Sequence, residues 1–182
     1  MNLSIAQTTE ATPSNVEFER DALLRAYRHM VMAREIDALE EHFAARGEAW
    51  FQVSGAGHEA VATLAAHLGP QDWLHCHYRD KALMLTRGMT AEMFFHALFC
   101  TDGSHSRGRQ MSAHMSWRDG HVLSLCGPVG NNALQSVGIA MQCKEQADAL
   151  SYCAPSAMAL LSKARFWRLS VPPCVTPYRF CF

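Results

Sequence analysis

Apolar residues recur at spacings of three or four over residues 17–46, and this period predicts a long amphipathic helix. The apolar positions along it are Leu24, Tyr27, Val31, Leu39 and Phe43. Gly47 stands where the C-terminal cap belongs, because glycine readily adopts the left-handed conformation that ends many helices. Residues 1–16, ahead of the helix, are expected to be a disordered lead-in.

Three shorter helices are expected next, over residues 57–67, 80–87 and 90–100. Gly88 is a suitable end for the second of them. The hydroxyl of Thr90 is a suitable N-terminal cap for the third, because it can accept a hydrogen bond from a backbone N–H of the first turn.

The middle of the chain is less regular. Residues 102–120 are rich in Gly, Ser, Arg and His, which indicates a loop. Residues 122–125 predict a short strand, and residues 131–146 predict a helix whose small side chains permit close packing.

The composition changes sharply near residue 148. From residue 149 to the end there is no Asp, Glu or Gly, and no acidic residue balances the bases of a helix that could be drawn over 157–168. We therefore expect three parts: residues 1–16, an ordered part over 17–147, and an aberrant tail over 148–182.

Charge and cysteine content narrow the function classes. The chain has 16 Lys and Arg against 17 Asp and Glu, which argues against a nucleic-acid partner or a membrane surface. No apolar run approaches the roughly 20 residues of a membrane span, and no signal peptide is visible. The seven Cys form no C-x-x-C pair, so we expect reduced thiols in a cytoplasmic protein rather than disulfides or zinc.

Tyr78 and Arg79 form a candidate anion site. An arginine presents a planar fork of N–H donors that suits phosphate oxygens, and a tyrosine hydroxyl adds another donor. The pair alone is weak evidence, because an arginine at a helix start is often a surface or salt-bridge residue. Asp80 reads equally well as the N-cap of the helix that follows.

Residues 127–132 form a Gly- and Pro-rich turn that opens a helix. Such turns expose backbone N–H and C=O groups, and a helix start carries partial positive charge. A flat heteroaromatic ring could be held by the backbone there, with Val129 against its face. An ordinary strand-to-helix connection is the alternative interpretation.

The polar loop over residues 104–114 carries several bases, and His114 is among them. It could gather near an acidic substrate or a lipoyl-bearing partner, or it could simply be a solvated loop. His75, His77, His105 and His114 lack the ligand spacing of a metal site, so no metal-binding residue is assigned.

In order along the chain, several segments resemble the alpha part of the thiamine-diphosphate-dependent 2-oxo acid dehydrogenases. This is the decarboxylating component of the pyruvate and branched-chain 2-oxo acid complexes. The resemblance spans about residues 20–147, and the sequence Gly108-Arg109-Gln110-Met111 favours the branched-chain type. The segments are the leading helix and residues 51–60, 78–80, 108–114 and 127–140.

The resemblance implies an α/β fold, a parallel sheet sandwiched by helices. This chain would supply a truncated thiamine-diphosphate-binding fold, mostly helical with one or two strands. The implied reaction is oxidative decarboxylation of a 2-oxo acid substrate with acyl transfer to lipoamide. The implied partners are a beta subunit or fused beta half and a lipoyl-bearing acyltransferase, in a hetero-oligomer.

The resemblance also implies residue roles. Tyr78 and Arg79 would hold the diphosphate, and the turn of Gly127, Pro128 and Val129 would hold the aminopyrimidine through its backbone. The matching loop histidine, His114, is the candidate catalytic side chain. A potassium ion bound near this turn in branched-chain members is not expected, since three of the four matching residues differ.

The Gly-Asp-Gly motif that would bind Mg2+ in this family is missing after residue 147. If the codons of residues 157–169 are regrouped one nucleotide earlier, the genetic code permits Gly-Asp-Gly, and the codons of residues 173–182 permit a family-like strand. Our hypothesis is a frameshifted tail on a truncated chain that has little or no activity alone. Missing strands would leave apolar faces of the early helices uncovered.

Two alternatives stay open. The chain could be a non-catalytic alpha-like module that associates with a beta subunit. It could also be a small helical protein whose tail is native and folded.

Overall fold

The computed structural model describes residues 19–125, 127–132, 135, 136, 138 and 139, together with the backbone of four residues in the tail. The predicted lead-in over residues 1–16 and the helix drawn over 157–168 lie outside these residues. In chain order the elements are helix α1 (Arg20–Ala45), 3-10 helix η1 (Glu59–His67), strand β1 (Trp73–Leu74), helices α2 (Lys81–Arg87) and α3 (Ala91–Leu98), and strands β2 (Tyr152–Cys153) and β3 (Phe180–Cys181).

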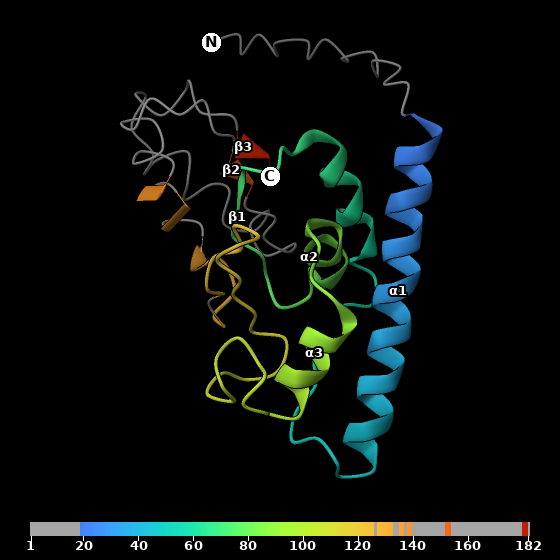
Figure 1. The fold of residues 1–182 in the computed structure, drawn as a ribbon, viewed down its shortest axis with the longest axis vertical. Helices are drawn as coiled ribbons and strands as arrows, with labels where there is room; N and C mark the ends of the chain where they lie inside the picture. The colour runs from blue at the N-terminus through green and yellow to red at the C-terminus, as the bar shows by residue number, and fades with distance from the viewer. Residues whose placement is uncertain are drawn as a thin grey trace, which may run out of the picture.

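The long helix α1 runs along one side of the molecule, with the other helices on its inner side (Figure 1). Its last residue is Ala45, Arg46 is the C-cap, and Gly47 follows with φ of 74°. Mostly small and charged side chains face inward, whereas Leu24, Tyr27, Val31 and Leu39 of the predicted apolar stripe face outward. Phe43, also predicted in the stripe, instead packs against Phe95 and Phe99. The buried residues are Ala26, Ala33, Ile36, Asp37 and Glu40.

The segment predicted as a helix over residues 57–67 is helical from Glu59 to His67. It is a 3-10 helix, in which hydrogen bonds close over three residues, as from the N–H of Val61 to the carbonyl of His58. The Thr63 hydroxyl also bonds the carbonyl of Ala60 at 2.7 Å, and so competes for a backbone acceptor. The tighter turn places Ala62 in the core with no exposed surface.

The predictions for α2 and α3 are confirmed to within two residues. Gly88 ends α2 with φ of 111°, and its N–H donates to the carbonyl of Leu85. Thr90 caps α3, because its side chain accepts a hydrogen bond from the N–H of Met93. These two short helices are therefore set by local cap chemistry.

The three strands pair in parallel in the order β1-β2-β3, with Trp73 opposite Tyr152 and Tyr152 opposite Phe180. The strand predicted over residues 122–125 is much shorter in the structure. Val122 alone forms bridges there, in parallel with Leu74 and antiparallel with Trp117. The described part is thus mostly helical with a small parallel sheet.

Helix α2 lies at the centre of the core, between α1 and β1 (Figure 1). Its first five residues are all buried, and it packs against both α1 and η1. Leu74, Leu83, Met84 and Phe94 are among the most buried apolar side chains. No helix among the described residues combines the length and apolarity needed to cross a membrane.

Candidate functional site

The candidate site begins where β1 ends. His75, Cys76 and His77 continue the buried path of the strand, and Tyr78 and Arg79 then form the turn that leads into α2. The predicted N-cap, Asp80, stands at the right position but its side chain does not cap the helix. Its carboxylate instead accepts a 2.6 Å hydrogen bond from the N–H of His77, because it folds back over the turn.

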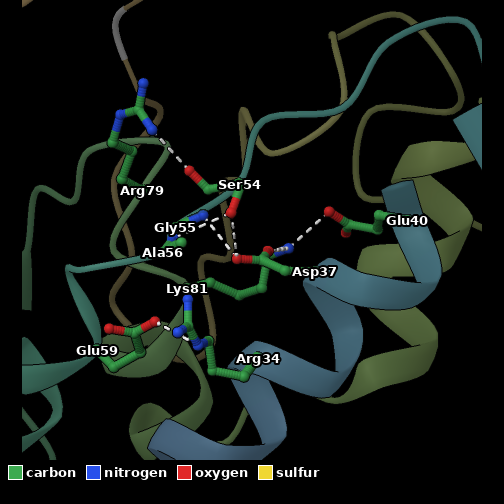
Figure 2. A network of polar contacts seen from close by, with 9 residues as sticks. All are labelled: Arg34, Asp37, Glu40, Ser54, Gly55, Ala56, Glu59, Arg79 and Lys81. Carbon is green, nitrogen blue, oxygen red and sulfur yellow. Dashed lines mark hydrogen bonds and ion pairs between the residues drawn. The ribbon is translucent and has the colours of Figure 1, made fainter. Parts of the chain in front are cut away.

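Arg79 is anchored to a loop far away in sequence. Its Nη1 donates a 2.8 Å hydrogen bond to the carbonyl of Ser54, as Figure 2 shows. A Cβ on the next residue, Gly55, would lie 2.7 Å from the carbonyl oxygen of Arg79, so only glycine permits this close approach. The guanidinium carbon also lies 5.6 Å from the centre of the Tyr78 ring.

His114 connects the two halves of the predicted site. Its ring stacks on that of Tyr78, with 5.6 Å between centroids and 25° between planes. Its Nε2 lies 3.3 Å from the position of a Cβ on Gly127. Since Nδ1 is 3.0 Å from the carbonyl of Ser112, Nδ1 carries the proton of the neutral ring and Nε2 is an acceptor. The turn at 78–79 and the turn at 127 thus lie on one side of the molecule, with one imidazole between them.

The turn over residues 127–132 is held by its own backbone and by the end of β1. The N–H of Asn131 donates to the carbonyl of Pro128 at 3.2 Å, and Gly130 has φ of 81°. Pro128 is exposed and Val129 is half-buried. The side chain of Asn132 donates to the carbonyl of His75, which fixes the start of the following helix.

Residues 132, 135, 136, 138 and 139 are helical, as predicted for this segment. Residue 131 belongs to the preceding turn, and the other residues of the predicted helix over 131–146 lie outside the described residues. The Ser136 hydroxyl donates to the carbonyl of Asn132 at 2.6 Å and lies 3.4 Å from His75 Nδ1. Burial lowers the pKa of His75, so this contact involves a neutral imidazole.

Burial shifts the pKa values of two neighbouring side chains, His77 and Asp80, in opposite directions. It lowers the pKa of His77 to about 4. The charges of His58, Arg79 and His114 add to this effect. Burial raises the pKa of Asp80 to about 7, although the hydrogen bond from the His77 N–H opposes the rise. Near neutral pH the site therefore holds a neutral His77 and a carboxyl that is close to its titration midpoint.

Several buried polar atoms of the candidate site lack a hydrogen-bond partner within the described part of the chain. They are both ring nitrogens of His77, Oδ1 of Asp80, the hydroxyl of Ser112 and Oδ1 of Asn132. The nearest basic group to Asp80 Oδ1 is His58 Nδ1, at 3.8 Å. Buried polar groups are costly when unpaired, so this concentration suits a polar ligand or ordered water.

A buried ion cluster, missed by the sequence analysis, lies behind Arg79. Lys81 is 1% exposed, and its Nζ contacts Oδ1 of Asp37 and lies 2.6 Å from Oε2 of Glu40 (Figure 2). Burial raises the pKa of Glu40, and the neighbouring Lys81 opposes that rise. The cluster ties α1 to the first residue of α2.

The same cluster supports the loop that holds Arg79. Oδ2 of Asp37 accepts hydrogen bonds from the Gly55 N–H at 2.7 Å and from the Ser54 hydroxyl at 3.0 Å. The spacing of Asp37 and Glu40 on the face of Ala33 and Ile36 was the available sequence signal. That signal is weak, because charged helix residues usually face water.

The polar loop is folded on itself. Ser104 is buried and its hydroxyl accepts from the N–H of Gly108, while His105 lies 2.6 Å from the side-chain oxygen of Gln110. Arg107 and Arg109 remain exposed. No group of three His, Cys, Asp or Glu side chains suited to a metal ion occurs among the described residues.

Two cavities lie apart from these side chains. One of about 190 Å³ lies between α1, η1 and Thr86, and one of about 340 Å³ lies beside Trp117. Neither is lined by Tyr78, Arg79 or His114. The candidate site is therefore defined by side-chain chemistry and close approach, not by one of these cavities.

A family model described as "Dehydrogenase E1 component" matches residues 27–157. The chain is 28% identical over 133 residues to the mitochondrial 2-oxoisovalerate dehydrogenase subunit alpha of Caenorhabditis elegans, covering 72% of this chain and 31% of that protein. It is 31% identical over 118 residues to the 2-oxoisovalerate dehydrogenase subunit alpha of Bacillus subtilis (strain 168), covering 63% of this chain and 36% of that protein.

A third relative, the mitochondrial 2-oxoisovalerate dehydrogenase subunit alpha 1 of Arabidopsis thaliana, is 26% identical over 122 residues, or 66% of this chain and 26% of that protein. The chain thus spans between about a quarter and just over a third of the length of these relatives. The matched region contains every residue of the candidate site.

Proposed function

The chain belongs to the dehydrogenase E1 component family, and on that premise we propose that it forms the alpha-side cofactor site of a thiamine-diphosphate-dependent 2-oxo acid dehydrogenase. The observation that carries the proposal is the position of His114, which stacks on Tyr78 and touches the space beside Gly127. This arrangement supports one ligand that contacts both turns.

The donor set fits the anionic end of such a cofactor. The hydrogen bond to Ser54 fixes one edge of the Arg79 guanidinium and orients its remaining N–H groups. Tyr78 adds a hydroxyl next to it. His58, Arg79 and His114 lie close enough to His77 for their charges to lower its pKa, so added negative charge would be favourable here.

The second turn fits the flat end of the cofactor. Gly127 has no side chain to block the approach of a ring. Val129 offers a backbone carbonyl and an N–H group, and Pro128, which has no N–H, adds a carbonyl and apolar surface. His114 lies at the junction of the two ends, which makes it the candidate catalytic side chain. When bound, thiamine diphosphate supplies the electron sink for decarboxylation, and the chain supplies position and electrostatics.

The described residues do not fit the Mg2+ that accompanies the diphosphate in this family, since they contain no suitable group of carboxylates. We propose that residues 148–182 are translated out of the family's reading frame and that the metal motif is lost with it. Without the metal, Arg79 carries most of the diphosphate charge, so we expect weak binding and little activity from this chain alone.

The substrate and partners follow from the relatives. The three proteins compared are named as alpha subunits acting on 2-oxoisovalerate, a branched 2-oxo acid, and we propose a substrate of that class. A beta subunit or fused beta half would complete the site, and a lipoyl-bearing acyltransferase would accept the acyl group in a hetero-oligomeric complex.

Calorimetric titration with thiamine diphosphate and Mg2+ tests the proposal on two purified proteins. One is this chain, and the other is a version whose gene is corrected by one nucleotide near codon 148 and co-expressed with a beta subunit. We expect binding only in the second, and at least about a tenfold loss when Arg79 is replaced by methionine there.

The two parts of the proposal fail separately. Micromolar binding by this chain alone would show that its tail serves the site, which contradicts the frameshift. Absence of binding by the corrected, co-expressed protein would refute the cofactor assignment. Sequencing the gene around codons 145–152 is an independent check, since the corrected frame must encode Gly-Asp-Gly.

A non-catalytic role is the second candidate, favoured by the lack of a metal-binding carboxylate group in the described part of the chain. In that case the chain pairs with a beta subunit and affects assembly. Co-purification with a beta subunit, with no turnover even after the reading frame is corrected, would support this role.

A further inference from the structure

The outward face of α1 carries large apolar side chains in water. Tyr27 is 64% exposed, Leu39 is 48% exposed and Leu24 is 46% exposed, while Val31 and Met32 are each more than two-fifths exposed. These residues lie on the side of α1 opposite to the buried Ala26, Ala33 and Ile36. A continuous apolar stripe of this kind usually marks a binding surface.

The charges on this face are arranged so that the face complements itself. Arg28 lies in the N-terminal half of α1 and Glu35 lies in the C-terminal half, and both are exposed. Neither forms an ion pair with another residue among those the structure describes. Because the two are seven residues apart, they lie on the same side of the helix, two turns from each other.

We propose that α1 pairs with α1 of a second copy of this chain, in an antiparallel arrangement about a twofold axis near residues 31 and 32. Each residue then faces the one equally far from the axis on the partner. Arg28 meets Glu35 of the copy, and Leu24 meets Leu39 of the copy. Twofold symmetry makes each of these contacts occur twice.

Two further pairs on the face agree with this register. Asp21 near the start of the helix comes opposite His42 near its end, which are groups of complementary charge when the histidine is protonated. Val31 meets Met32 of the copy at the axis, so two exposed apolar side chains come together there. A parallel arrangement would instead place Arg28 against Arg28 and Glu35 against Glu35.

The position of α1 leaves room for such a partner. The helix lies along one side of the molecule, and α2 and α3 lie on its inner side (Figure 1). At about 1.5 Å per residue, its 26 residues give a contact line of roughly 39 Å. A second helix of the same length could pack along this whole line.

Sedimentation velocity of the full purified chain over a range of concentrations tests the inference. The wild-type chain should form a dimer. Arg28→Glu and Glu35→Arg should each weaken it by about tenfold or more, because each reversal creates two like-charge contacts. The double variant Arg28→Glu/Glu35→Arg should restore the dimer to near wild-type affinity.

Two further variants complete the test. Leu24→Glu should abolish the dimer, and circular dichroism should show an unchanged fold because the side chain is exposed. Glu41→Arg makes the same charge change as Glu35→Arg on the same helix but away from the stripe, and should leave the dimer intact.

The inference does not depend on the proposed reaction. A chain that stays monomeric at every concentration would overturn it. So would a dimer that is insensitive to both single reversals, or one that the double variant fails to restore. A monomer that forms a one-to-one complex with a beta subunit, lost on Leu24→Glu, would assign the face to that subunit instead.

Discussion

The backbone N–H of Gly55 donates a 2.7 Å hydrogen bond to the carboxylate of Asp37, eighteen residues earlier in the chain. The same carboxylate is paired with Lys81, so one buried acid holds both the loop behind Arg79 and the start of α2. Because the partners are buried, loss of any one leaves the others without compensation.

Lys81→Met should therefore be strongly destabilising. It leaves the carboxylates of Asp37 and Glu40 buried without a cation, and breaking such a cluster costs about 3–5 kcal/mol. Urea unfolding monitored by circular dichroism measures the effect. Arg46→Met is the matched control, since it breaks the exposed pair with Glu48 and should cost less than about 1 kcal/mol. Equal effects of the two variants would contradict the assigned importance of the cluster.

Gly55→Ala should displace the loop that anchors Arg79. The added methyl group would lie 2.7 Å from the carbonyl oxygen of Arg79, a distance that the backbone must relieve by moving. We expect a loss of about 1–3 kcal/mol in the free energy of unfolding. Gly69→Ala is the control, because its nearest neighbour, a carboxylate oxygen of Asp72, would lie at an ordinary 3.6 Å. If the free energy of unfolding falls no more in Gly55→Ala than in the control, the loop can move at little cost and the prediction is wrong.

Asp80 and His77 should give opposite dependences of stability on pH. Asp80 keeps its proton up to about pH 7 in the folded chain but loses it near 3.8 when unfolded, so its contribution falls as pH rises from about 4 to 7. His77 titrates near 4 when folded and near 6.5 when unfolded, so its contribution is lost as pH falls from 6.5 to 4.

The two effects largely cancel in the wild-type chain, and single variants should separate them. Asp80→Asn should make stability rise more steeply with pH between 4 and 6.5 than in the wild type. His77→Asn should make it fall between 4 and 7, and each change should be on the order of a few kcal/mol across the window. Urea midpoints at a series of pH values measure both. Parallel profiles for all three proteins would refute the opposed titrations.

Gly127→Ala should move the ring of His114. The new Cβ would lie 3.3 Å from Nε2, tight enough to press the imidazole against Tyr78. The ring resonances of His114 in a histidine-labelled NMR spectrum should shift, with little change in stability. Gly138→Ala has open space around its new Cβ and should leave those resonances in place. Unchanged resonances in both variants would separate His114 from the turn at 127.

Local chemistry made part of this structure predictable. The Thr90 cap and the Gly88 terminus bounded two helices, and the resemblance named the two turns that meet at His114. Helix type over residues 59–67 was not predictable from spacing, since Val61 and Thr63 fit either kind of helix. The length of the strand at Val122 depended on pairing with Leu74, which is a tertiary contact.

The ion cluster marks the clearest limit of sequence reasoning. Asp37, Glu40 and Lys81 are residue types that normally face water, and nothing local indicates that a lysine 44 residues away will lie between two acids. The orientation of α1 had the same cause. Its apolar period was visible in the sequence. The side that is buried, however, carries Asp37 and Glu40, the partners of Lys81, and not Leu24 or Tyr27.

The separation between Asp37 and Lys81 has a consequence during synthesis. Asp37 and Glu40 leave the ribosome some forty residues before their cation does, so for that interval both acids must remain hydrated. The first helix, α1, can form early, but it cannot pack against α2 until Lys81 has been synthesised. The buried pairs between the first helix and α2 can therefore form only after Lys81 has emerged, and the inward side of that helix meets water until then.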